Sequence, residues 1–282
     1  FFSNVEPRMN TDHSPNAHLE QWENAKNPVV SMSKEYPAGH HILPHQHQRG
    51  QLIYASAGTM RLRTCDEYWL LPPFRGVWMP PYVEHEMTAS TSVSLRTLYV
   101  NVESFTLSLP NHPVGIGITP LLRELLIRAS YFPITYHPDS FEERLLRLTL
   151  EETKHAFECG LKLPMGRDKR LKKICDTLLE NPGDVRSLAD WANEVGATTR
   201  TLTRLFRSET GISFIQWREQ VRIVSAILGL STGERVSQVA EELGYASQGA
   251  FTVMFKRVTG KSPREYLNDL SRSQIKLSCM EE

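Results

Sequence analysis

The stretch GYASQGAFTVMFKRVTGKSPREYL (Gly244–Leu267) repeats a pattern already present in RTLTRLFRSETGISFIQW (Arg200–Trp217). The pattern begins slightly upstream of each stretch. Its matched positions are Ala192, Gly196, Leu202, Phe206, Gly211, Ser213 and Trp217 in the first copy, and Ala240, Gly244, Phe251, Phe255, Gly260, Ser262 and Tyr266 in the second. The offset is 48 residues at the alanine and the first glycine, and 49 at the other positions. Such internal similarity indicates two copies of one structural unit.

Each copy has the residue order of a helix-turn-helix. A small residue allows two helices to cross closely, a glycine makes the tight turn, an N-cap opens the second helix, and a glycine ends it. These positions are Ala192, Gly196, Thr198 and Gly211 in the first copy and Ala240, Gly244, Ser247 and Gly260 in the second. The first helices are expected at 187–195 and 236–243.

The second helix of each copy has one apolar and one polar face. Leu202, Leu205 and Phe206 recur at helical spacing and are expected to be buried. The polar face carries residue types that recognise bases. Arg can form two hydrogen bonds with guanine, Gln can hydrogen-bond adenine, and an apolar group can contact the thymine methyl. The predicted DNA-binding residues are Arg200, Thr203, Arg204 and Arg207 in the first unit and Ser247, Gln248, Thr252, Val253 and Lys256 in the second. The alternative, a plain helical bundle with a solvated arginine face, does not explain the duplicated turns.

These residues resemble the DNA-binding domain of AraC/XylS-type bacterial transcription regulators over about 100 residues. The resemblance implies two helix-turn-helix units joined by one long helix, here expected at about 213–228. At ~1.5 Å per residue that helix spans about 24 Å, which suits two reading heads on successive major grooves. Many relatives have a basic residue where this chain has Val253, so the second unit is expected to make fewer polar base contacts.

Length and composition agree with a two-domain regulator. The 282 residues carry a net charge of zero, which argues against a purely electrostatic DNA binder. Residues 167–269 hold 16 Lys and Arg against 13 Asp and Glu, a balance of +3 that leaves −3 elsewhere. The four dispersed cysteines favour a reduced, cytoplasmic location. No transmembrane run or signal peptide is visible, so no membrane partner is expected. The chain begins at Phe1 and not at Met, so its natural start is expected further upstream.

A second ordered motif lies among several short predicted strands between residues 29 and 102. Gly39, His45, His47, Gln51 and Gly58 have the spacing G-x5-H-x-H-x3-Q-x6-G, and the pair Pro80 and His85 follows. The pattern resembles the two-part signature of the cupin barrel. It departs from that signature at Gln51, which replaces a glutamate, and at Tyr82, which replaces a glycine.

The motif leaves two kinds of ligand open. His45, His47 and Gln51 share parity along an extended segment and can point to one face, where His85 would join them from another strand. Three imidazoles and an oxygen donor suit Zn, Ni, Fe or Cu, so these four residues are a candidate site for a divalent transition metal. An amide is a poorer ligand than a carboxylate, and the favoured interpretation is an organic effector held by the same residues. Four aromatic residues could either line the pocket or pack in the core: Tyr54, Trp69, Trp78 and Tyr99. Of these, Tyr54 and Trp78 are predicted to complete the effector site.

The predicted fold class is α+β multidomain: a small cupin or jelly-roll-like β-barrel with helices, then an all-α tandem helix-turn-helix. Helices are expected at 120–130 and 140–157, and the stretch 110–117 is expected to be a connection. The predicted divisions are a mobile N-terminal arm (1–27), the effector-binding barrel (28–115), a helical dimerisation segment and linker (116–165), the DNA-binding domain (166–270) and a C-terminal tail (271–282). The resemblance implies a homodimer through the helix expected at 140–157. Packing of that helix on its own domain explains its apolar face equally well.

The predicted function is a non-enzymatic, sequence-specific transcription regulator tuned by a small effector or metal in the barrel. Its predicted partners are double-stranded operator DNA, the effector, RNA polymerase and a second copy of the chain. Activation is the working expectation, although the residues leave activation or repression open. One alternative is a metal-dependent cupin enzyme fused to a DNA-binding domain, against which Gln51 argues. A non-enzymatic scaffold with degenerate binding heads is the other.

Overall fold

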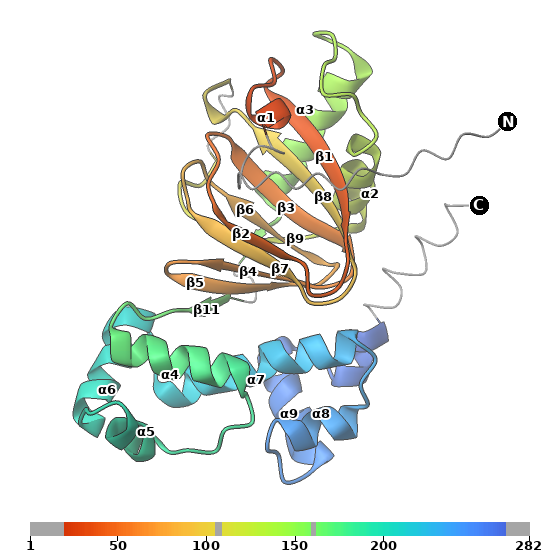
Figure 1. The fold of residues 1–282 in the computed structure, drawn as a ribbon. Helices are drawn as coiled ribbons and strands as arrows, with labels where there is room; N and C mark the ends of the chain where they lie inside the picture. Colours follow the sequence, from red (N-terminus) through yellow and green to blue (C-terminus); the bar gives the residue numbers. More distant parts are fainter. Residues whose placement is uncertain (1–19, 105–108, 159–161, 269–282) are drawn as a thin grey trace, which may run out of the picture.

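The computed structural model describes residues 20–104, 109–158 and 162–268. Two antiparallel sheets form the upper part of the molecule, and a helical region follows below them (Figure 1). This is the predicted fold class. The sheets form a two-layer, jelly-roll-like arrangement and not one closed barrel, because their strands are hydrogen-bonded in two separate sets.

The first sheet has the strand order β1-β8-β3-β6-β9-β10, and the second has the order β11-β5-β4-β7-β2. The strands are β1 (Val29–Tyr36), β2 (His41–His45), β3 (Gly50–Ala57), β4 (Met60–Thr64), β5 (Glu67–Leu71), β6 (Arg75–Met79), β7 (His85–Ala89), β8 (Val93–Val100), β9 (Val114–Gly117), β10 (Phe157–Glu158) and β11 (Lys162–Pro164). The pairings are antiparallel, and successive side chains along each strand point to opposite faces of its sheet.

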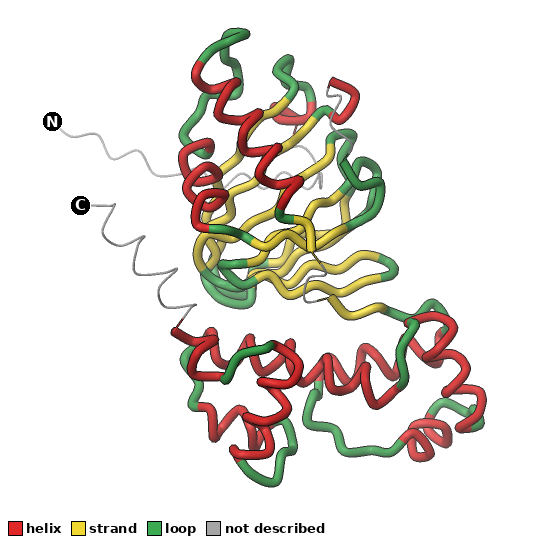
Figure 2. Tube along the Cα trace, turned by 180° about the vertical axis from the view of Figure 1, so that it is seen from behind, coloured by secondary structure: helices red, strands yellow, loops and turns green. Residues whose placement is uncertain are grey.

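Alternation along the strands produces two apolar cores. Ile53, Trp69 and Tyr99 belong to the core between the two sheets. Leu52 and Trp78 belong to a second core on the outer face of the six-stranded sheet. Helices α2 (Pro120–Ala129) and α3 (Phe141–His155) cover that face, where they lie across the strands in Figure 2.

The C-terminal region is helical. Its elements are α4 (Lys169–Glu180), α5 (Leu188–Glu194), α6 (Thr199–Leu205), a π-helical turn η2 (Phe206–Thr210), α7 (Phe214–Ser231), α8 (Val236–Glu242) and α9 (Gln248–Thr259). A last helical stretch covers 263–268. The long helix α7 joins the α4–α6 group to the α8–α9 group (Figure 1), as the family resemblance implied.

The two regions touch through β4, β5 and the chain that leaves β11. Arg63 of β4 forms an ion pair of 2.8 Å with Asp176 of α4. Arg167 lies 2.6 Å from Asp66, in the β4–β5 turn. The Trp217 ring N–H donates to the carbonyl of Pro164 (2.7 Å). Leu70 of β5 and Leu163 of β11 also belong to the apolar core of the helical region, so the two regions share polar and apolar contacts.

Several segments differ from the sequence expectations. Residues 114–117 form strand β9, which pairs with β6, and the predicted linker contains β11, which pairs with β5. Both segments carry proline or glycine, which hid their extended conformation. Residues 20–27, predicted as part of a mobile arm, contain helix α1 (Glu20–Glu23) and contacts to the sheets. Residues 1–19 and the predicted C-terminal tail lie outside the described residues. Among the described residues, no helix combines the length and the apolar character needed to span a membrane.

Candidate histidine site and nucleic-acid interface

Three buried imidazoles meet between the two sheets. His45 ends β2, His47 follows two residues later, and His85 begins β7. The antiparallel register places His45 opposite His85. One ligand nitrogen from each of the three lies within 4.8 Å of the others, and this is the only such His, Cys, Asp or Glu group among the described residues. We call these three residues the histidine site.

Each imidazole has an oxygen atom close to its Nδ1. His45 Nδ1 lies 2.7 Å from the carbonyl oxygen of Leu43, and His85 Nδ1 lies 2.9 Å from that of Val83. A carbonyl oxygen only accepts, so Nδ1 carries the proton in both rings and Nε2 carries the lone pair. His47 Nδ1 lies 2.9 Å from Glu23 Oε1. This back-side arrangement is the one that orients metal-ligating histidines in proteins.

Burial keeps His85 neutral at physiological pH. Burial, with His45 and His47 as neighbours, lowers the pKa of His85 to about 3. Within the described part of the chain, the Nε2 atoms of His47 and His85 and the Oε1 atom of Gln51 are buried without a hydrogen-bond partner. Buried polar atoms are normally satisfied. Imidazole lone pairs and an amide oxygen left in this state fit the needs of a divalent transition metal.

Gln51 is held beside the histidines by Tyr99. The Gln51 side-chain N–H donates to the Tyr99 hydroxyl oxygen (3.2 Å). The Gln51 Oε1 atom is therefore the side-chain atom that could bind a metal. The Tyr99 ring stands edge-on to His47, with centroids 5.1 Å apart, and burial raises the pKa of its hydroxyl. The structure therefore brings together four of the six residues predicted for effector binding: His45, His47, Gln51 and His85.

Tyr54 and Trp78 do not join them. Tyr54 is three residues from Gln51 on β3 and so points to the opposite face. Trp78 pairs with Leu52 across the sheet. The rings of Tyr54 and Trp78 both lie in the core under α2 and α3. The Trp78 ring N–H donates to the carbonyl of Pro110 (2.8 Å). The expectation that these two residues line a pocket with the histidines is corrected: they pack the outer face of the sheet.

Glu23 is the residue of the site that the sequence did not indicate. It lies in α1, within a polar segment without periodicity, and reaches His47 across 24 residues of chain. Sequence patterns report local structure, and this contact depends on the tertiary docking of 20–27. The only hint in the sequence was Gln51, which stands where the motif usually has a glutamate. A site without that carboxylate can receive one from another part of the chain.

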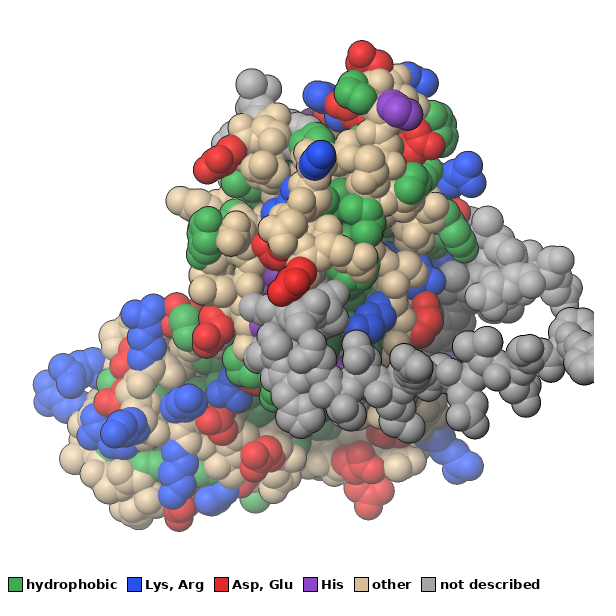
Figure 3. Space-filling view, turned by 45° about the horizontal axis from the view of Figure 1, so that its top comes forward, with side chains coloured by type: hydrophobic (Ala, Val, Ile, Leu, Met, Phe, Trp, Pro, Cys, Tyr) green, Lys and Arg blue, Asp and Glu red, His purple; other side chains and the backbone are tan. Residues whose placement is uncertain are grey.

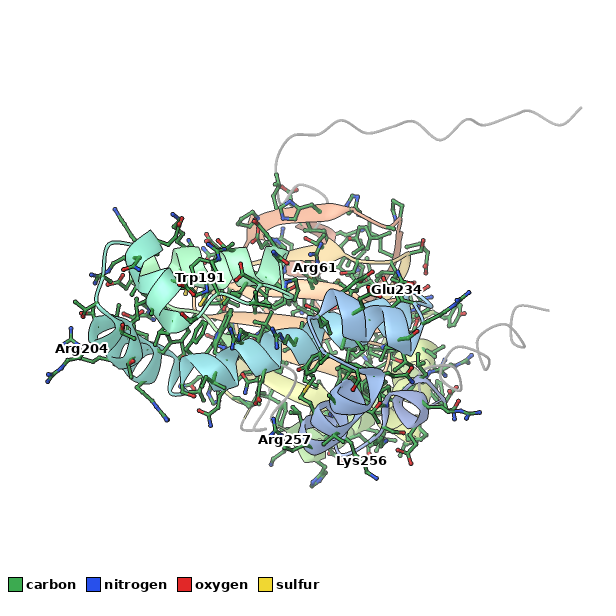
Figure 4. All side chains as sticks on the ribbon, turned by 90° about the horizontal axis from the view of Figure 1, so that it is seen from below. Arg61, Trp191, Arg204, Glu234, Lys256 and Arg257 are labelled. Atoms are coloured by element: carbon green, nitrogen blue, oxygen red, sulfur yellow. The ribbon has the colours of Figure 1, made fainter. Side chains whose placement is uncertain are left out.

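The first candidate DNA-reading helix is α6. Thr198 accepts from the Thr201 N–H as its N-cap, and Gly196 before it has φ +64°. Arg200, Thr203 and Arg204 are exposed on α6, and Arg207 is exposed on the π-helical turn that follows. None of these arginines forms an ion pair within the described residues. Arg204 points away from the body of the protein (Figure 4).

The second candidate helix is α9. Ser247 caps it, and Gly244 before it has φ +74°. Gln248, Val253 and Lys256 are exposed, Val253 at 71%, and Thr252 is half-buried. The hydroxyls of Thr203 and Thr252 donate to carbonyls four residues earlier, Thr199 and Gln248, so each can only accept a further hydrogen bond. In Figure 3, Lys and Arg side chains gather at the lower left, over the first unit.

Two family descriptions match the chain: "AraC-like ligand binding domain" over residues 27–147 and "Helix-turn-helix domain" over residues 191–269. The HTH-type transcriptional regulator NimR of Escherichia coli is 32% identical over 227 residues, which cover 80% of this chain and 82% of NimR. The arabinose operon regulatory protein of Escherichia coli is 34% identical over 124 residues, 43% of this chain and 42% of that protein. The structure of ToxT from Vibrio cholerae covers 86% of this chain and 98% of ToxT at 14% identity, with a TM-score of 0.37.

Proposed function

The chain belongs to the AraC family of transcriptional regulators, and from that premise we propose that its effector is a divalent transition metal held by the histidine site. The family places a ligand-binding domain before a helix-turn-helix domain, so regulation is by an effector that tunes DNA binding. The proposal concerns which residues receive the effector and which read the DNA.

One observation supports the metal above an organic effector. The buried Nε2 atoms of His47 and His85 and the Oε1 atom of Gln51 are left without a hydrogen-bond partner, while backbone carbonyls hold Nδ1 of His45 and His85. A metal would use these lone pairs together with His45, and would stabilise the domain by joining strands β2, β3 and β7. The relatives are transcriptional regulators, and we propose a sensing role for the ion, not a catalytic one.

Elemental analysis of gently purified protein tests the site. We expect near-stoichiometric metal in the wild type and loss of that metal in the double variant His45→Ala/His47→Ala. The matched control is His137→Ala, which removes an exposed histidine outside the site. Equal metal content in wild type and double variant would show that any ion binds elsewhere. Metal absent from both, after incubation with Zn²⁺ or Ni²⁺, would redirect the search to organic effectors.

For DNA recognition we propose that α6 and α9 enter successive major grooves. The base-reading candidates are Arg200, Thr203, Arg204, Gln248, Thr252 and Val253, and the remaining predicted residues, Arg207, Ser247 and Lys256, are suited to phosphate contacts. Support comes from their exposure and from the capped helices that carry them.

A set of contacts runs from the histidine site to α4, the first helix of the helical region. His85 pairs with Thr64 on β4, and the neighbouring Arg63 forms the ion pair with Asp176 of α4. Asp66, in the next turn, forms the ion pair with Arg167, just before α4. We propose that the ion changes operator affinity by favouring one arrangement of this interface. An effector acts only through different affinities for the two arrangements.

The remaining partners are also proposals. Phe141 and Leu148 are seven residues apart on α3 and about half exposed, which suits pairing with α3 of a second copy. Sedimentation should then show a dimer that Leu148→Glu converts to a monomer, and an unchanged mass would refute this face. A regulator of this family works in the cytoplasm with RNA polymerase, and activation is the proposed direction.

A further inference from the structure

A loop of the α4–α6 group lies against the α8–α9 group. Residues 181–186 connect α4 to α5, and we call them the bridging loop. The backbone of Gly183 lies directly against the end of α8, because a Cβ at Gly183 would collide with the carbonyl oxygen of Glu242. A Cβ at Gly244 would meet the Gly183 carbonyl oxygen at 3.2 Å. The bridging loop therefore contacts the turn that precedes α9.

Two arginines of α7 hold the bridging loop. Arg222 Nε donates to the carbonyl of Pro182 (3.3 Å), and the Arg222 guanidinium lies over the ring of Tyr245, 5.3 Å from its centroid. Arg218 Nη1 donates to the carbonyl of Arg186 (2.9 Å). Residues four apart lie on one face of a helix. Arg222 therefore contacts the bridging loop and the α8–α9 group at once.

The bridging loop is also attached to α5. The Arg186 guanidinium donates to the Asp184 carboxylate, with distances of 2.9 Å from Nε and 2.6 Å from Nη2. The same guanidinium lies over the ring of Trp191, 3.7 Å from its centroid, and Trp191 is a buried residue of α5. A paired guanidinium stacked on a buried ring keeps one geometry. The loop therefore moves together with α5.

We infer that the bridging loop fixes the position of α9 relative to α6, and that Gly183 and Arg222 are positioning residues for the spacing of two DNA half-sites. This inference rests on the proposed entry of α6 and α9 into successive major grooves. Helix α7 is one attachment of the α8–α9 group, and a single attachment leaves rotation about it. The loop adds a second attachment at Gly244, which opposes that rotation.

An ion pair between α7 and α9 does not replace this second attachment. Glu219 of α7 lies 2.8 Å from Arg257 of α9, with side chains 35% and 62% exposed. Solvent screens a pair of this kind, so it contributes little stability. The backbone contacts of Gly183 are close-packed and are not screened.

Half-site spacing is sensitive to such a fixed arrangement. One inserted base pair moves the second half-site by ~3.4 Å and rotates it by ~34° about the DNA axis. Two reading helices in a fixed arrangement then cannot both reach their grooves, and the gain from binding through two linked units is lost. Units that rotate against each other tolerate the insertion. The bridging loop therefore gives the protein selectivity for spacing without touching a base.

The test measures the affinity of the full chain for DNA of altered spacing. The DNA is obtained from a binding selection with the wild type, and fluorescence anisotropy then compares it with versions that carry one base pair more or less between the half-sites. We expect the altered spacing to cost the wild type at least ~10-fold in affinity. Arg222→Met and Gly183→Ala should reduce this cost to less than about threefold, because the second attachment is lost.

Three controls separate positioning from folding. Arg235→Met removes an exposed arginine outside the bridging loop and should keep the wild-type cost. DNA with the first half-site alone should bind wild type and Arg222→Met within about twofold of each other, since α6 is intact. Arg222→Lys should restore part of the spacing cost, because its ammonium group can donate to the Pro182 carbonyl.

The possible results are distinct. An equal spacing cost in wild type, Arg222→Met and Gly183→Ala would overturn the inference and leave reading by two helices standing. Weaker binding of Arg222→Met to the single half-site would show a role in the fold of the α4–α6 group and would overturn the positioning role. A wild type that selects only one half-site would overturn the two-groove proposal and this inference together.

Discussion

His85 is the most deeply buried imidazole of the histidine site, at 1% exposure. Burial explains both its lowered pKa and the lack of a hydrogen-bond partner at its Nε2. The ring donates Nδ1–H to a carbonyl. In this buried position water does not reach Nε2, and a second proton on the ring is unfavourable. The same burial that would suit the residue to the proposed role of neutral metal ligand also makes the fold sensitive to acid.

The acid sensitivity can be measured. The pKa of His85 is about 3 in the folded chain and about 6.5 when unfolded. The unfolded chain therefore binds the extra proton as pH falls through about 6.5, and stability is lost between about 6.5 and 3. The slope approaches about 1.4 kcal/mol per pH unit. Urea unfolding of metal-free protein at several pH values should give a smaller slope in His85→Gln. Equal slopes would mean that His85 is not the group that titrates.

Arg204 is the clearest single base-reading candidate, because it is exposed on α6 and points away from the protein. Arg204→Ala should cost ~1–3 kcal/mol at one operator position and relax the preference there. A binding selection on random DNA reads out both effects. Arg235→Ala is the matched control, since Arg235 is exposed outside α6 and α9. The base-reading role fails if the sequence preferences of Arg204→Ala and wild type coincide.

At the scale of elements, the helix-turn-helix units were predictable because their signals are local. Caps, turn glycines and apolar spacing are all read within a few residues, and Gly196, Gly211, Gly244 and Gly260 have the expected positive φ. The π-helical turn after α6 is an irregularity that no spacing indicated. Val258, at the end of the apolar stripe of α9, is 43% exposed.

The sheets were less predictable because their pairing is long-range. Strand β7 alternates buried and half-buried residues as a strand should, yet its start, His85, was recognised only through the motif. The misplacement of Tyr54 could have been avoided, since its parity differs from that of Gln51 on a strand. The role of Glu23 could not have been found, because it depends on a contact between segments that share no local pattern.

The turns of the reading units give a test at this scale. A Cβ at Gly196 would meet nothing within 4 Å, so Gly196→Ala isolates the effect of φ +64° and should destabilise by ~1–2 kcal/mol. Gly249→Ala is the control, because Gly249 lies in helix α9 without a positive φ and a Cβ there is in ordinary contact only with Ser247 Oγ. It should be neutral or stabilising by up to ~1 kcal/mol. Thermal melts that rank the two variants in the reverse order would contradict the turn geometry.

At the scale of the whole molecule, the histidine site and the reading helices lie in different regions that share one interface. Thr59 of the sheet region donates to the Ser231 hydroxyl at the end of α7 (3.1 Å), and Phe74 packs edge-on against Tyr266 with centroids 5.1 Å apart. Together with the ion pairs at Arg63 and Arg167, these contacts join the sheets to both helix-turn-helix units. These contacts are the route by which the proposed effector site would act on α6 and α9.

The most direct test of this account is operator affinity at controlled free Zn²⁺, measured by fluorescence anisotropy on DNA obtained from a binding selection. The account predicts that zinc changes the affinity of the wild type by about 5–150-fold, and that His45→Ala/His47→Ala binds the same DNA with no response to zinc. An identical zinc response in the wild type and the double variant, or no response in a wild type shown to hold the metal, would contradict it.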